Sequence, residues 1–130
     1  PSQVTVVVPV SVPVKLDVAV PLPAFAEAVA ALHGAVCAVV PDARLILFGH
    51  VNEGNLHVNV LDALEQDEAV SDAVLKLVAS YGGSISAEHG VGRAKREWLP
   101  LSRSAEEIAV MRSIKSALDP LGLLNPDVLL

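Results

Sequence analysis

The segment GHVNEGNLHVN at residues 49–59 constrains the fold of this chain more than any other part of it. Apolar runs at residues 45–48 and 56–61 flank its polar centre, and short apolar runs of this kind are typical of strands. The central Glu-Gly pair suits a tight two-residue turn, so the segment predicts a β-hairpin. In that register His50 stands directly opposite His57, with Cβ atoms about 4.5–5.5 Å apart. Two imidazoles this close can bind one metal ion, and a third ligand must then come from another element.

Strand and helix patterns alternate on both sides of the hairpin. The Val-rich residues 14–20 predict a strand, and Pro21 and Pro23 then begin a helix with an apolar stripe. A second helix is expected after Asp67, ending at a Gly-Gly pair, and residues 84–87 predict a short fourth strand. The order strand, helix, strand, strand, helix, strand indicates an α+β fold. We expect a ferredoxin-like split βαβ arrangement, with two helices on one face of an antiparallel sheet.

A C-terminal helical extension is expected beyond this unit. Ser104 and Glu107 have the spacing of a capping box, and apolar residues at helical spacing follow them. We therefore divide the chain into an extended Val- and Pro-rich segment at residues 1–13, a ferredoxin-like domain at residues 14–100 and a helical segment at residues 101–130. With 130 residues, 52% of them hydrophobic, the chain is long enough to bury a core.

Charge and composition exclude several classes of function. Fifteen acidic residues against nine basic ones give a formal charge of −6, which argues against nucleic acid as a partner. No stretch approaches the apolar length of a membrane span, and the first residues lack the pattern of a signal peptide. The single Cys37 cannot form an internal disulfide, which favours a reducing compartment and a cytoplasmic location.

Five polar residues are predicted to meet at one end of the sheet. We expect the first and third strands to run parallel, with Lys15 at the beginning of the first and His57 at the beginning of the third. The second and fourth strands then end at the same edge of the sheet, where they place His50, Glu88 and His89. His50, His57 and Glu88 would then form a His₂Glu set, the ligand pattern of a catalytic divalent-metal site. His89 leaves the strand on the side opposite to Glu88 and is free to act as a base. A single histidine in a strand is more often an ordinary structural residue, so a ferredoxin-like metal-binding or interaction module without turnover is the alternative.

Four motifs in order along the chain add a family resemblance. VKLDVAVPLPAF, GHVNEGNLHVNV, SISAEHGVGRAKREWL and LDPLGLLNP resemble signatures of the C-terminal domain of FAD-linked 2-hydroxyacid dehydrogenases and oxidases, in the vanillyl-alcohol oxidase superfamily. The resemblance extends from Lys15 to the C-terminus. It implies an enzyme that oxidises a D-2-hydroxy acid to the 2-oxo acid by hydride transfer to FAD. The sequence HVNV is closer to the 2-hydroxyglutarate and lactate branches than to the glycolate branch.

The resemblance also implies partners and residue roles. The partners are a small 2-hydroxy acid and an FAD-binding domain that this chain lacks, while the electron acceptor stays unknown and a homodimer is one option for the assembly. The metal is zinc (Zn2+) or another divalent cation, which polarises the substrate hydroxyl. The residues with implied roles are the catalytic base His89, the metal ligands His50, His57 and Glu88, the substrate contacts Lys15 and Asn59, and the flavin-side residue Asn125.

Overall fold

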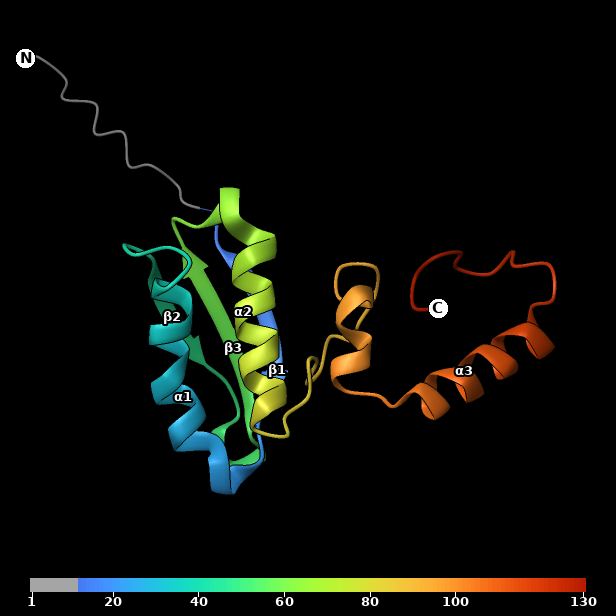
Figure 1. Ribbon diagram of the computed structural model, residues 1–130, viewed down its shortest axis with the longest axis horizontal. Helices are drawn as coiled ribbons and strands as arrows, with labels where there is room; N and C mark the ends of the chain where they lie inside the picture. The colour runs from blue at the N-terminus through green and yellow to red at the C-terminus, as the bar shows by residue number, and fades with distance from the viewer. Residues whose placement is uncertain (1–11) are drawn as a thin grey trace, which may run out of the picture.

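A computed structural model describes residues 12–130 and shows a small sheet, two helices packed on it, and a third helix farther along the chain (Figure 1). Most of the extended segment predicted at residues 1–13 lies outside the described residues. The main elements are β1 (Val14–Ala19), α1 (Leu22–Cys37), β2 (Arg44–Phe48), β3 (Asn55–Leu61), α2 (Asp67–Ser80) and α3 (Ala105–Leu118). Short 3₁₀ turns lie at Val51–Glu53, Leu64–Gln66 and Arg96–Leu101.

The sheet has three strands in the order β1-β3-β2, and both pairs are antiparallel. The expectation that the first and third strands run parallel is therefore wrong. The helix α1 returns the chain to its starting end before β2 begins, so β1 and β2 run in the same direction. β3 lies between them and runs in the opposite direction. The beginning of β3 thus lies beside the end of β1, and Asp17, not Lys15, is paired with His57.

The α+β class expected from the sequence is confirmed, but the four-stranded ferredoxin-like detail is not. Within the described part of the chain, the predicted strand at residues 84–87 is reduced to one bridge between Ser84 and Ala19. Beyond Ser84 the backbone N–H groups of Ala87 and its two successors donate to a side chain of β1, that of Asp17. This segment therefore turns across the end of β1 and does not extend along it.

The helices α1 and α2 lie side by side and cover one face of the sheet (Figure 1). Alternation along each strand directs the small aliphatic side chains towards these helices. The buried residues of this interface are Leu16, Val18, Leu56, Val58 and Val60 from the sheet and Leu32, Val36, Val70, Val74 and Val78 from the helices.

The opposite face of the sheet carries different side chains because every second residue of a strand points away from the core. We call this surface the polar face and define it by Lys15, Asp17, Phe48, His57 and Asn59.

The connection between β2 and β3 differs from the predicted two-residue turn. It spans residues 49–54, because the carbonyl of His50 accepts the N–H groups of Glu53 at 2.9 Å and Asn55 at 3.2 Å. Gly54 closes the connection in the left-handed conformation, with φ of +76°. As a result Phe48 stands opposite His57, and the predicted cross-strand pair of His50 with His57 is wrong.

The predicted capping box is present at the start of α3. The Ser104 hydroxyl accepts the Glu107 N–H at 3.2 Å, and the Glu107 carboxylate accepts the Ser104 N–H at 2.7 Å. Only Ile108 of this helix is buried, whereas Ile114 is 55% and Leu118 77% exposed. Across residues 12–130, none of the helices has the length and apolar character needed to cross a bilayer.

Candidate functional site

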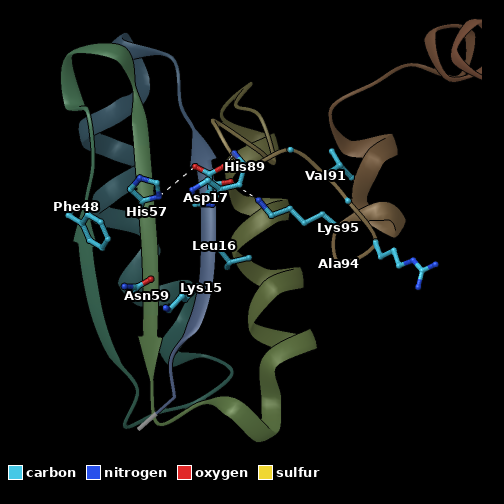
Figure 2. A pocket seen from close by; sticks show the side chains of 13 residues that line it. Lys15, Leu16, Asp17, Phe48, His57, Asn59, His89, Val91, Ala94 and Lys95 are labelled. Atoms are coloured by element: carbon cyan, nitrogen blue, oxygen red, sulfur yellow. Dashed lines mark hydrogen bonds and ion pairs between the residues drawn. The ribbon is translucent and has the colours of Figure 1, made fainter. Parts of the chain in front are cut away.

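A hollow of about 560 Å³ lies between the polar face of the sheet and residues 89–95 (Figure 2). The polar face contributes its five residues to one wall, and the loop contributes His89, Val91 and Lys95 to the other. Gly90 follows His89 with φ of +77°, a conformation that L-residues rarely adopt, so the chain turns away from the sheet at this point.

Asp17 connects β1 with the loop that carries His89. Its carboxylate is buried, with 3% of the residue exposed. One oxygen, Oδ2, accepts the backbone N–H groups of Ala87 at 3.1 Å and of Glu88 and His89 at 2.9 Å each. Burial by itself would raise the pKa of Asp17, but the N–H groups of His89 and Glu88 and the charge of Lys95 lower the pKa below its ordinary value. The carboxylate therefore holds the loop as an anion.

Lys95 makes a second connection between the same two elements. Its buried ammonium group donates to the carbonyl oxygens of Asp17 at 2.7 Å and Ile85 at 2.6 Å. Burial lowers the pKa of Lys95, while the charge of Asp17 opposes that effect. The side chain of Asp17 and its main chain are thus both bound to residues 85–95.

His57 and His89 face one another in the hollow (Figure 2). Their rings are stacked, with centroids 5.4 Å apart, and Phe48 packs on His57 with centroids 5.0 Å apart. Nδ1 of His57 lies 3.6 Å from Oδ1 of Asp17. Asp17, His57 and His89 each offer one donor atom within 4.8 Å of the others, so they form a group that could hold a metal ion.

His50 and Glu88 form a second pair beside this group. Nδ1 of His50 lies 3.3 Å from Oε1 of Glu88, and the Asn55 side chain donates to the same oxygen at 3.1 Å. Glu88 and His89 thus contact different neighbours, although the regular strand from which this was predicted is absent beyond Ser84. Of the predicted metal ligands, the structure brings His50 and Glu88 together but places His57 with Asp17 and His89.

The donor set His50, His57 and Glu88 suits zinc in its chemistry, since imidazole nitrogen and carboxylate oxygen are common zinc ligands. Two ligand atoms of a tetrahedral zinc are about 3.3–3.6 Å apart, given bonds of about 2.0–2.2 Å. The separation of 3.3 Å between His50 and Glu88 fits that range. The assignment of these three residues as ligands stays a prediction.

The predicted substrate residues lie one step farther along the sheet. Lys15 and Asn59 are cross-strand partners, and both side chains line the hollow in the row next to Asp17 and His57 (Figure 2). A cationic ammonium group and an amide therefore lie close to the two stacked imidazoles. Such a combination can bind a small carboxylate beside a proton acceptor.

Asn125 lies outside this hollow. It lines a separate depression at the C-terminal end, together with Lys115 and Leu124. This end is connected to the loop by Arg93, which donates to the carbonyl of Pro126 at 3.0 Å, and by Arg96, which contacts Asp127. The predicted flavin-side role of Asn125 stays a prediction.

Sequence reasoning missed Asp17 and Lys95 as members of the site. The available signal for Asp17 was a carboxylate within the otherwise apolar strand at residues 14–20, because a buried charge requires partners. The signal for Lys95 was weaker, because the neighbouring basic residues Arg93 and Arg96 suggest a cluster exposed to solvent.

Comparisons with known proteins give one family match and several similar chains. The family described as FAD linked oxidases, C-terminal domain, matches residues 7–129. A D-2-hydroxyglutarate dehydrogenase of Xanthomonas citri pv. viticola is 51% identical over 126 residues, which cover 88% of this chain and 26% of that protein. A protein of the same name from Stutzerimonas stutzeri is 42% identical over 125 residues, with the same shares of 88% and 26%.

A mitochondrial D-2-hydroxyglutarate dehydrogenase of Danio rerio is 41% identical over 86 residues, 64% of this chain and 16% of the relative. The chain thus spans about a quarter of the length of the two bacterial relatives.

Proposed function

This chain belongs to the family of FAD linked oxidases, C-terminal domain, and from that premise we propose that it is the substrate-binding part of an enzyme that oxidises a D-2-hydroxy acid to the 2-oxo acid. The names of the relatives support 2-hydroxyglutarate as the substrate. One observation carries the proposal: Lys15, Asn59, His57 and His89 line a single hollow on the polar face. When bound by the rest of a longer protein, FAD supplies the acceptor for the hydride that leaves C2 of the substrate.

The residues of the hollow have different roles towards the substrate. The ammonium group of Lys15 binds a substrate carboxylate, and the amide of Asn59 beside it orients the same end through hydrogen bonds. A ring nitrogen of His89 accepts the proton of the C2 hydroxyl, so that the hydride and the proton leave to different acceptors.

We further propose that His50, His57 and Glu88 hold a divalent cation, zinc above all, next to the substrate. Such an ion polarises the substrate hydroxyl and the carbonyl formed from it. The group Asp17, His57 and His89 is the competing donor set, and the two sets share only His57. Metal content of single variants separates them.

The test uses the flavoprotein that carries this domain. We expect His89→Asn to keep the metal and to lower kcat by about 10²–10⁴-fold, the usual contribution of a general base. Glu88→Gln should lose metal and activity together, and His50→Ala should lose metal as well. Steady-state oxidation of D-2-hydroxyglutarate and elemental analysis after incubation with excess zinc provide the two readouts.

His33→Asn is the matched control, because His33 is an exposed histidine of α1 outside the hollow. Full metal content in His50→Ala and Glu88→Gln, with loss in His57→Ala and His89→Asn, would assign the ion to the competing set. A metal-loaded flavoprotein that oxidises no 2-hydroxy acid would instead favour a metal-binding module without turnover.

A further inference from the structure

We propose that Asp17 is a positioning residue that arranges two separate parts of the site, one with each carboxylate oxygen. Oδ2 fixes the backbone of residues 86–89, and Oδ1 determines which ring nitrogen of His57 carries the proton. The second half rests on the proposed function only in treating His57 as a metal ligand. The first half is independent of any ligand.

Oδ2 is surrounded by donors from one short segment. Three consecutive backbone N–H groups, those of Ala87, Glu88 and His89, lie 2.9–3.1 Å from it, and the Ser86 hydroxyl lies 3.3 Å away. Consecutive N–H groups converge on one atom only where the chain curves around that atom. The carboxylate thus imposes the curve that sends the Glu88 side chain towards His50 and the His89 side chain towards His57.

Oδ1 of the same carboxylate is buried and has no hydrogen bond among the described residues. The ring nitrogen Nδ1 of His57 lies 3.6 Å from it, so a shift of about 0.5 Å brings the pair into hydrogen-bond range. A buried carboxylate oxygen gains from a donor and is destabilised by a facing lone pair, which favours the tautomer with the proton on Nδ1. Nε2 then keeps its lone pair for a metal or another electrophile, the arrangement usual for histidine ligands.

Asp119 shows what a purely structural carboxylate looks like in the same chain. It is buried, with 8% of the residue exposed, and it accepts the N–H groups of Leu123 and Leu124 at 2.9 Å each and the ammonium group of Lys115. Both of its oxygens have partners within the turn after α3. Asp17 differs because one of its oxygens is left for a residue of another strand, so Asp119 serves as the matched control.

The experiment measures the His57 tautomer and the exchange of the loop amides in the metal-free, ¹⁵N-labelled 130-residue chain. Two-bond ¹⁵N–¹H correlation spectra at about pH 8, where an ordinary imidazole is neutral, identify the protonated nitrogen. We expect the Nδ1–H tautomer of His57 and slow exchange at residues 87–89 in the unaltered chain. These two measurements need no variant and no activity.

Asp17→Asn separates the two functions of the carboxylate. Its amide oxygen can still accept the loop N–H groups, which places its NH₂ group against Nδ1 of His57. That nitrogen must then accept, so we expect the tautomer to switch to Nε2–H while the loop amides stay protected. Zinc affinity should fall about 10–100-fold, and Asp119→Asn should alter neither tautomer nor affinity.

An Nε2–H tautomer in the unaltered chain, or an unchanged tautomer in Asp17→Asn, would overturn the assignment to Oδ1. Fast exchange at residues 87–89 in the unaltered chain would overturn the assignment to Oδ2. Absence of zinc binding or of hydroxy-acid oxidation would contradict the proposed function and leave both spectroscopic results in place.

Discussion

Single buried carboxylates close two of the turns in this chain. Asp17 accepts the N–H groups of the loop at residues 86–89, and Asp119 accepts those of Leu123 and Leu124 after α3. The hydrogen bonds from Lys115 and from the Leu124 N–H lower the pKa of Asp119 to about 2, although burial opposes them. Both carboxylates are thus ionised in the folded state, and protonation weakens the hydrogen bonds that they accept.

The stabilisation by Asp119 should depend on pH in a defined window. The pKa of Asp119 is about 2 in the folded state and about 3.9 in the unfolded state. Its stabilisation of the folded state is therefore complete above about pH 3.9 and is lost as the pH falls towards 2. Asp119→Asn should therefore be less stable than the unaltered chain at about pH 5 and should approach it at about pH 2.5. Urea unfolding followed by circular dichroism measures this, and a difference independent of pH would contradict it.

At the scale of elements, the sequence predicted the existence of most strands and helices but not how they pair. Hydrophobic periodicity correctly indicated β1, β2, β3 and the three helices, because it reports which side of an element is buried. Register depends on the conformation of the connection, and the 3₁₀ turn at Val51–Glu53 leaves no such pattern. The prediction of a fourth strand was wrong because, beyond Ser84, backbone N–H groups donate to the Asp17 carboxylate and do not form a ladder with a neighbouring strand.

The site was predictable in its residue types and less so in its arrangement. Lys15, His57 and His89, three of the five residues expected to meet at one end of the sheet, line one hollow together with Asn59. His50 and Glu88 are not among the residues that line it, and the argument for the meeting relied on a wrong strand direction. Lys15, His57 and Asn59 converge because alternate residues of antiparallel β1 and β3 share a face, and the loop bound to Asp17 brings His89 to them. Asp17 could not be identified as the connection between strand and loop, since no spacing rule relates residues so distant in sequence.

Gly54 provides a test at the scale of the hairpin. A Cβ on Gly54 would lie 2.2 Å from the carbonyl oxygen of Val20, and its φ is +76°. We expect Gly54→Ala to lower the free energy of unfolding by roughly 3 kcal/mol or more, because the β2–β3 connection must move away from β1. The hydrogen bond of 2.9 Å from the Val20 N–H to the Gly54 carbonyl would weaken with it.

Gly82→Ala is the matched control for this prediction. Gly82 has a similar φ of +71°, but a Cβ there would meet no atom within 4 Å. The control should therefore show only the backbone penalty, about 1–2 kcal/mol. Equal losses in the two variants, measured by urea unfolding, would show that the close approach to Val20 does not matter.

At the scale of the whole molecule, the chain consists of a packed unit and a C-terminal segment with few buried side chains. The hydrophobic core cluster is drawn from residues 14–85. α3 extends away from the sheet in Figure 1, and its apolar residues Ile114 and Leu118 are exposed. The chain spans about a quarter of the length of its bacterial relatives. The homodimer stays a prediction.

A chain that ends at Arg103 should therefore keep the fold of the sheet, α1 and α2. Truncation there removes one buried apolar side chain, that of Ile108, and the hydrogen bonds of Arg93 and Arg96 to Pro126 and Asp127. It also removes the exposed ion pair of Arg96 with Asp127, and exposed pairs contribute only about 0–1 kcal/mol. Leu32→Ala in the full chain, by contrast, opens a cavity in the core and should cost about 2–5 kcal/mol. We expect thermal unfolding to stay cooperative in the truncated chain. Truncation should lower the Tm of the full chain by less than Leu32→Ala does. The opposite order, or loss of the cooperative transition, would mean that α3 is an integral part of the folding unit.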